Sequence, residues 1–222
     1  DVFKKRAQAP ALINNSEHIT WIELHKNILC MSRALSKQGL ASGDKCAILA
    51  QPGKDYISLL LSLWANGIVA APMNTRQPST VIKKQLESIN CRNLIVGDEF
   101  TGNLGESIKI LSLSIICHMS QKSNRGASNI NIAFNQPATI IFTSGSSGEG
   151  KACLHTFSNH YFNALGSNEN ILLEENDSWL LSLPLFHVAG LGILFRCLLS
   201  GAAIALPSDT DSLAGTIKTV RP

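Results

Sequence analysis

Residues 138–151 read Ala138-Thr-Ile-Ile-Phe-Thr-Ser-Gly-Ser-Ser-Gly-Glu-Gly-Lys151. The first five are apolar or β-branched and predict a buried strand that ends at Phe142. The segment that follows, Thr143–Lys151, consists almost entirely of Ser, Thr and Gly and ends in a lysine. Glycines let successive N–H groups turn toward one point, hydroxyls add donors and lysine adds charge, so the segment predicts a polyphosphate-binding loop. A flexible linker is the alternative, and linkers seldom follow a strongly apolar strand.

Short apolar runs alternate with amphipathic segments on both sides of this loop. This alternation predicts an α/β fold of mainly parallel sheets flanked by helices. Thr20 and Glu23 have the spacing of a capping box, and Ser79 is the expected cap of a later helix. We expect strands at 46–50, 68–71, 93–96, 138–142, 152–155, 178–183 and 202–206, and helices at 20–38, 55–65, 79–90, 158–168, 190–199 and 213–220.

The segment His118–Gln136 differs in composition from the rest of the chain. It is rich in Ser, Asn and Gly and holds few apolar residues, which is typical of a loop. We therefore predict a linker between two α/β lobes, with the first lobe at 1–136 and the second at 137–222.

The composition excludes several classes of protein. Of 222 residues 45% are hydrophobic and 16% charged, and a net charge of +3 without a basic cluster gives no indication of nucleic-acid binding. The six cysteines are dispersed, which favours free thiols in a reducing compartment, and the histidines lack metal-ligand spacing. No apolar run approaches the ~20 residues of a membrane span. Without a signal peptide, a cytoplasmic location is the default expectation.

A Walker-type nucleotide-binding loop is one interpretation of Gly145–Lys151. Such a loop ends in a Ser or Thr that holds magnesium, where this chain has Ala152. It also opens a helix at its lysine, whereas Ala152–Thr156 has the pattern of an extended segment. Both points count against a Walker-type NTPase.

Phe142–Lys151 resembles instead the phosphate-loop signature of the adenylate-forming superfamily, Thr-Ser-Gly-[Ser/Thr]-[Ser/Thr]-Gly-x-Pro-Lys-Gly. Gly150 replaces the proline of that pattern and Ala152 its last glycine. Weaker matches, at Ile19–Leu24, Gly39–Asp44 and Ala70–Asn74, extend the resemblance over nearly the whole chain.

The resemblance implies an acid–thiol ligase that uses ATP with Mg²⁺ and then coenzyme A. A carboxylate would attack the α-phosphorus of ATP, pyrophosphate would leave, and coenzyme A would displace AMP to give a thioester. Lys151 and His187 would be the catalytic residues. The resemblance places the phosphate contacts on Thr143, Ser144, Gly145, Ser146, Ser147, Gly148 and Lys151.

Within the superfamily, Leu183-Pro-Leu-Phe-His-Val-Ala-Gly-Leu191 followed by Ile193–Arg196 resembles most the o-succinylbenzoate–CoA ligases of menaquinone biosynthesis. Other short-chain and aryl acyl-CoA synthetases share the Pro-x-x-His core and stay as alternatives. The resemblance implies that His187 and Gly190 line the acid pocket; a hydrogen-bonded core position is the alternative for His187.

Arg196 lies in an otherwise apolar helix, where a guanidinium group requires a partner. We expect it to hold the second carboxylate of the substrate through a bidentate contact. The alternatives are an ion pair with Asp177 or Glu175, or a surface position that keeps the charge in water. Trp179 is expected to serve packing.

The superfamily also has a downstream Tyr-Gly-x-[Thr/Ser]-Glu segment, a ribose-binding aspartate and a lysine in a C-terminal domain, and none of these motifs occurs in these 222 residues. We therefore expect an incomplete N-terminal domain that is inactive alone, with a non-catalytic nucleotide-binding protein as the alternative. The expected partners are small molecules, with a homodimer as the candidate assembly.

Overall fold

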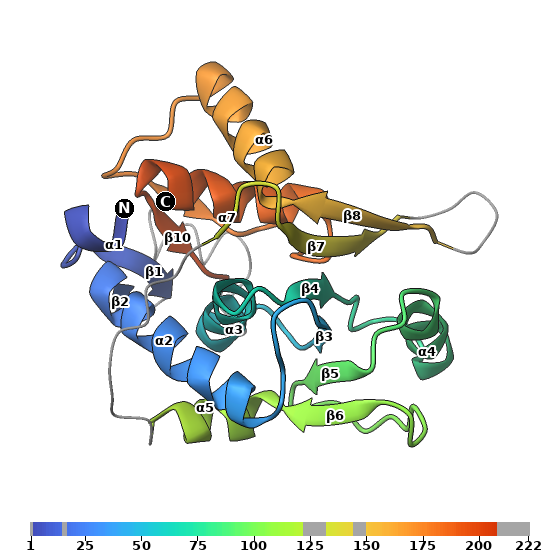
Figure 1. The fold of residues 1–222 in the computed structure, drawn as a ribbon. Coiled ribbons are helices and arrows are strands. Elements are labelled where there is room, and N and C mark those ends of the chain that lie inside the picture. Colours follow the sequence, from blue (N-terminus) through green and yellow to red (C-terminus); the bar gives the residue numbers. More distant parts are fainter. Residues whose placement is uncertain (1, 15–16, 122–131, 144–149, 208–222) are drawn as a thin grey trace. The chain divides into compact units, whose positions relative to one another are not determined.

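The computed structural model describes residues 2–14, 17–121, 132–143 and 150–207 (Figure 1). Helices and strands alternate along most of these ranges, as an α/β fold requires. The helices are α1 (Val2–Lys5), α2 (Trp21–Lys37), α3 (Lys54–Ala65), α4 (Ser79–Ser88), α5 (Leu113–Gln121), α6 (Phe157–Asn170) and α7 (Val188–Ser200). The strands are β1 (Pro10–Asn14), β2 (Glu17–Thr20), β3 (Lys45–Leu49), β4 (Val69–Pro72), β5 (Asn93–Val96), β6 (Lys109–Ser112), β7 (Pro137–Phe142), β8 (Ala152–Thr156), β9 (Ser178–Leu180) and β10 (Ala203–Ala205).

The chain divides into two compact units, and the division differs from the one expected after residue 136. Unit 1 comprises Asp1–Asn27, Pro52–Lys54 and Ser158–Pro222, and unit 2 comprises Ile28–Gln51 and Asp55–Phe157. Strand pairing explains the difference. The N-terminal strands β1 and β2 share a sheet with β9 and β10, whereas β7 and β8 complete the sheet built by β3 to β6. Residues on both sides of the polar segment 118–136 therefore belong to unit 2.

Unit 2 is built on a six-stranded sheet with the order β6-β5-β3-β4-β7-β8 (Figure 1). The first five strands run parallel, and β8 returns antiparallel to β7 at the edge. Central strands of a parallel sheet are covered on both faces, so their residues are continuously apolar. In β3, the run Cys46–Leu49 is buried throughout. The predicted mainly parallel α/β sheet is confirmed.

Apolar helix faces supply the rest of the core of unit 2. In α3 every residue from Tyr56 to Trp64 is buried. The indole N–H of Trp64 donates to the carbonyl oxygen of Ala138 at the start of β7, over 2.8 Å. Trp64 also meets Phe157 edge to face, with ring centroids 5.7 Å apart. These contacts hold α3 to the strand that leads into the predicted phosphate loop.

Unit 1 contains the four-stranded sheet β2-β1-β10-β9. β1 and β10 are parallel, with Leu12 opposite Ile204, although nearly the whole chain separates these two residues. β9 is parallel to β10, and β2 is antiparallel to β1 at the other edge. The N-terminal strands are thus part of the same sheet as the strands that flank α7.

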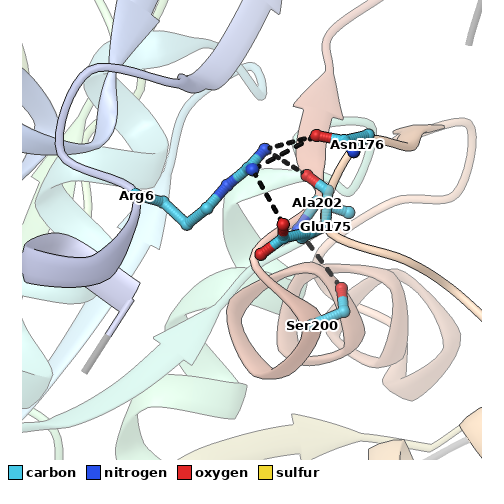
Figure 2. Close-up of polar contacts among 5 residues, drawn as sticks. All are labelled: Arg6, Glu175, Asn176, Ser200 and Ala202. Atoms are coloured by element: carbon cyan, nitrogen blue, oxygen red, sulfur yellow. Dashed lines mark hydrogen bonds and ion pairs between the residues drawn. The ribbon is translucent and has the colours of Figure 1, made fainter.

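Arg6 fastens the N-terminal segment of unit 1 to the turn before β9 (Figure 2). Its guanidinium group donates to the side-chain oxygen of Asn176 over 3.2 Å and pairs with the Glu175 carboxylate at 3.3 Å. It also donates to the backbone carbonyl oxygen of Glu175. Ser200, at the end of α7, accepts a hydrogen bond from the amide of Ala202 over 3.2 Å and so shapes the turn into β10.

Two helix caps were predicted from the sequence, and one of them is found. Thr20 and Glu23 form the predicted capping box, because the Thr20 amide and hydroxyl both donate to the Glu23 carboxylate, over 2.8 and 2.7 Å. The Ser79 cap is wrong: Pro78 is the N-cap of α4 and makes no side-chain cap bond. The start of the polar segment is also helical, because α5 extends to Gln121. The helix predicted at 213–220 lies outside the described residues.

Two further expectations concern disulfide bonds and membrane-spanning helices. All six cysteines are unpaired, and only Cys153 is exposed. In the described ranges, no helix combines the length and the apolar character needed to cross a membrane.

Candidate functional site

The base of the predicted phosphate loop is a β-hairpin in unit 2, formed by β7 and β8 (Figure 1). Phe142 pairs with Ala152 at the end of the ladder. One step further, the amide of Thr143 donates to the carbonyl oxygen of Lys151 over 2.9 Å, and the Thr143 hydroxyl reaches the same oxygen at 3.3 Å. These bonds bring the first and last residues of the predicted loop together. Ser144, Gly145, Ser146, Ser147 and Gly148 lie outside the described residues.

The hairpin leaves the sheet where parallel α/β proteins bind ligands. β7 runs parallel to β4, with Thr139 opposite Ala70, so its end at Phe142 belongs to the carboxyl edge of the sheet. Ligands of open α/β sheets bind outside this edge. Lys151 is exposed there, and among the described residues it makes no ion pair. Its charge is therefore available to an anionic ligand.

The residues after Lys151 exclude a Walker loop. Such a loop opens a helix at its lysine, so that the helix N-terminus faces the phosphates. Here Ala152–Thr156 is a strand paired along its whole length with β7. The extended segment predicted from the sequence is confirmed, and the Walker-type NTPase is ruled out.

Gly150 occupies the narrow neck of the hairpin. A Cβ atom built on Gly150 would lie 2.4 Å from the carbonyl oxygen of Thr143, closer than real Cβ contacts come. Any other residue would therefore shift the backbone at this point. The departure from the proline of the superfamily pattern has a local structural role, because it permits the close approach of the two strands.

His187 lies in unit 1, at the end of the connection from β9 to α7. It is the N-cap residue of α7 in an extended conformation, and its side chain makes no cap hydrogen bond. Its amide donates to the carbonyl oxygen of Pro184 over 3.1 Å, which closes a tight turn. The imidazole is exposed, with the ring of Phe186 4.6 Å away. The alternative of a hydrogen-bonded core histidine is therefore excluded, and the imidazole can meet a ligand.

Gly190 supports this turn from the first turn of α7. It is buried, and a Cβ atom at this position would lie 2.2 Å from the carbonyl oxygen of Pro184 and 2.7 Å from that of Leu183. The missing side chain lets the helix sit directly on the turn that presents His187. These atoms near Gly190 belong to the protein backbone, and its contact with the substrate stays a prediction.

The side chain of Arg196 is buried, with 7% of the residue exposed. Its Nε donates to the side-chain oxygen of Asn168 over 2.8 Å, and one Nη donates to the carbonyl oxygen of Ile171 over 2.6 Å. The guanidinium carbon lies 4.1 Å from the centre of the Trp179 ring. An ion pair with Asp177 or Glu175 was one expectation, but these contacts are with neutral groups, and Glu175 pairs with Arg6.

The candidate residues therefore form two groups, each defined within its own unit. Thr143 and Lys151 meet in unit 2, and His187, Gly190 and Arg196 belong to α7 and its N-terminal turn in unit 1. The sequence did not indicate the role of Gly150 at the neck, the support of the turn by Gly190 or the contacts of Asn168. The described residues contain no cluster of three or more His, Cys, Asp and Glu side chains able to hold a metal.

Comparison with known sequences identifies the family. The sequence pattern of the AMP-binding enzymes matches residues 1–222, and this chain belongs to that family. The 2-succinylbenzoate–CoA ligase of Geobacillus sp. (strain WCH70) is 30% identical over 193 residues, which cover 87% of this chain and 39% of that protein. The Bacillus cereus ligase of the same name (strain ATCC 14579) is 29% identical and is covered to 40%.

Solved structures share the fold. The o-succinylbenzoate CoA synthetase (MenE) from Bacillus subtilis, in complex with the acyl-adenylate intermediate OSB-AMP, superposes with a TM-score of 0.87 at 26% identity, covering 99% of this chain and 57% of that one. The same enzyme in complex with ATP and magnesium ion gives a TM-score of 0.85 at 25% identity and is covered to 59%. This chain thus spans about two fifths of its curated relatives and under two thirds of these structures.

Proposed function

We propose that this chain provides the ATP-binding part and part of the acid pocket of an AMP-forming acid–CoA ligase, with o-succinylbenzoate as the acid. The observation that carries the proposal is the β7–β8 hairpin, which returns Lys151 to Thr143 at the carboxyl edge of a parallel sheet. The Geobacillus and B. cereus ligases support the choice of acid, as does the B. subtilis synthetase solved with OSB-AMP.

In the first step, a carboxylate oxygen of the acid attacks the α-phosphorus of ATP, and the bond from that phosphorus to the pyrophosphate oxygen breaks. Lys151 would stabilise the charge that develops on the leaving pyrophosphate, together with the Thr143 hydroxyl and the Ser and Gly residues that follow it. The attacking carboxylate is already ionised at neutral pH, so the step needs no protein base.

In the second step, the thiol of coenzyme A gives up its proton to solvent, its sulfur attacks the acyl carbon, and AMP leaves with the former carboxylate oxygen. His187 is the residue proposed to lie beside the acyl group, because its imidazole is exposed at the end of the β9–α7 connection. The second carboxylate of o-succinylbenzoate would need a cationic partner, for which Arg196 was the candidate from the sequence.

Magnesium would arrive with the nucleotide. Mg²⁺ in nucleotide sites is held mainly by substrate phosphates, water and one or two protein oxygens, so it does not require a dedicated cluster of protein ligands. When bound, the ion would neutralise phosphate charge.

A cytoplasmic location agrees with six unpaired cysteines, which are typical of a reducing compartment.

Acid-dependent exchange of labelled pyrophosphate into ATP tests the first step on the whole protein. Thioester formation, followed by mass spectrometry with ATP and coenzyme A, tests the second. A panel of o-succinylbenzoate, benzoate and short-chain acids identifies the substrate, and a higher rate with another acid would assign a different acyl-CoA synthetase. Exchange with none of them would reject the ligase in favour of a non-catalytic nucleotide-binding protein.

Sedimentation of the same preparation tests the homodimer.

A further inference from the structure

The contacts of Arg196 join three elements of unit 1. Arg196 itself lies on α7, Asn168 lies in the last turn of α6, Ile171 follows that helix, and Trp179 is the middle residue of β9. One guanidinium group thus links the end of α6, the strand β9 and the helix α7. The side chain is buried, so these contacts are shielded from water.

The described contacts of the guanidinium group are all with neutral groups. The amide of Ile171 closes the last turn of α6 by donating to the carbonyl oxygen of Ser167. The carbonyl oxygen of Ile171 lies at the helix C-terminus, where carbonyl groups have no partner within the helix, and it can therefore accept from Arg196. A cation is favoured there by the helix dipole, and the face of the Trp179 ring attracts it further. The edge of the guanidinium group formed by Nε and one Nη is used by Asn168 and Ile171.

The same contacts fix both ends of the connection that presents His187. That connection leaves β9 at Leu180 and enters α7 at Val188. Arg196 ties α7 to Trp179 on β9, while Gly190 allows α7 to rest on the Leu183–Pro184 turn. A shift of α7 against β9 would move the backbone at both ends of the turn.

We propose that Arg196 is a positioning residue, which fixes the turn carrying His187 by bracing α7 against β9 and the end of α6, and that it does not bind the second carboxylate of the acid. The catalytic consequence rests on the proposed ligase function. The brace itself does not, so the two can fail separately.

Partner variants separate the two roles of Arg196. We compare Arg196→Lys, Asn168→Ala and Trp179→Leu in the whole protein, measuring kcat and KM for o-succinylbenzoate and for benzoate. A brace predicts that all three lower kcat/KM for both acids alike, by about tenfold for Arg196→Lys, and leave the ratio between the acids within about twofold. Glu169→Gln is the matched control, because Glu169 is an exposed α6 residue next to Asn168, and it should leave both rates unchanged.

A carboxylate-binding role predicts the opposite pattern. Arg196→Lys would then lower turnover of the dicarboxylate selectively, whereas Asn168→Ala and Trp179→Leu would not change the ratio between the acids. That result would overturn the proposal.

A double-mutant cycle asks whether Arg196 acts through His187. If it does, Arg196→Lys lowers kcat much less in a His187→Ala background than in the wild type, because the group being positioned is already gone. Equal losses in the two backgrounds would show that Arg196 acts independently of His187 and would reject the positioning role.

Hydrogen exchange gives a readout that does not depend on activity. Arg196→Lys and Trp179→Leu should speed amide exchange in residues 181–187 by about tenfold or more while leaving β3 unchanged, because only the braced turn is loosened. Unchanged exchange in 181–187 would reject the brace even in an active ligase. Wild-type protein without acid-dependent exchange of pyrophosphate would reject the ligase function and leave this measurement to decide the brace.

Discussion

A Cβ atom on Gly150 would lie 2.4 Å from the carbonyl oxygen of Thr143. The amide and hydroxyl of Thr143 already donate to the carbonyl oxygen of Lys151. Thr143 therefore cannot move away from a side chain at residue 150 without weakening these hydrogen bonds. The position of Lys151, and with it the charge offered to a phosphate, therefore depends on the absence of a side chain at residue 150.

Gly150→Ala should open this neck and slow acid-dependent ATP–pyrophosphate exchange by about tenfold. Overpacking costs roughly 1–3 kcal/mol, and tenfold corresponds to about 1.4 kcal/mol. Gly150→Pro should be at least as slow. Gly166→Ala in α6 is the control, since its Cβ meets no atom within 4 Å. It should preserve the rate and raise the melting temperature, because alanine is the better helix former. Full activity in Gly150→Ala would show that the neck is compliant.

Lys151→Ala should slow the same exchange roughly 10²-fold or more, because a group that stabilises developing charge on the leaving pyrophosphate is lost. Lys84→Ala removes an exposed lysine from α4 in the same unit and should leave the rate unchanged. Equal rates for wild type and Lys151→Ala would place the phosphate site elsewhere.

The capping box at the start of α2 predicts that the stability of the fold depends on pH. Hydrogen bonds from the Thr20 amide and hydroxyl lower the pKa of Glu23 below its usual value. A carboxyl with a lower pKa in the folded state stabilises the fold above its unfolded pKa, and this contribution disappears as the pH falls through the folded pKa. When the pH is lowered below about 5, the melting temperature of Glu23→Gln should therefore fall less than that of the wild type. An NMR titration that finds the pKa of Glu23 in the folded wild type at or above that of an unfolded glutamate would contradict this origin.

The cysteines should react in order of burial. Six thiols are expected in denatured protein without reductant, because all six cysteines are unpaired. In native protein the exposed Cys153 should react first. Burial raises the pKa of Cys46 and Cys91, and that of Cys197 to about 12, so these thiols should react slowest because only the thiolate is nucleophilic. Timed labelling and mass spectrometry give the order, and a denatured count below six would indicate a disulfide.

The elements that follow from the sequence are those with strong local signals. β5 occurs at Asn93–Val96 as predicted, and the capping box at Thr20 sets the start of α2. β1, β2 and β6 were missed. The edge strands β2 and β6 are half exposed and lack the apolar run of a central strand, whereas β1 is a central strand whose buried run, Ala11 and Leu12, is short. The division into units was also beyond local reasoning, since it depends on the pairing of β1 with β10.

The part of the candidate site that lies in one contiguous stretch of sequence was predictable, and the part built from distant residues was not. The motif around Thr143 and Lys151 is contiguous, so glycines, hydroxyls and a lysine in one segment suffice to suggest its chemistry. The contacts of Arg196 depend on Asn168, Ile171 and Trp179, which become neighbours only when α6, β9 and α7 pack together. Sequence reasoning identified the need for a partner without identifying the partner.

The parallel pairing of Ile13 with Ala205 imposes an order on biosynthesis. During translation β1 leaves the ribosome long before β10 exists, whereas all of unit 2 has emerged once residue 157 has left the ribosome. Unit 2 can therefore acquire its structure while β1 is still an unsatisfied edge strand, and long-range pairings of this kind are slow to form and prone to aggregation. Nascent chains stalled before residue 203 should thus protect unit 2 from protease while leaving β1 open to chaperones.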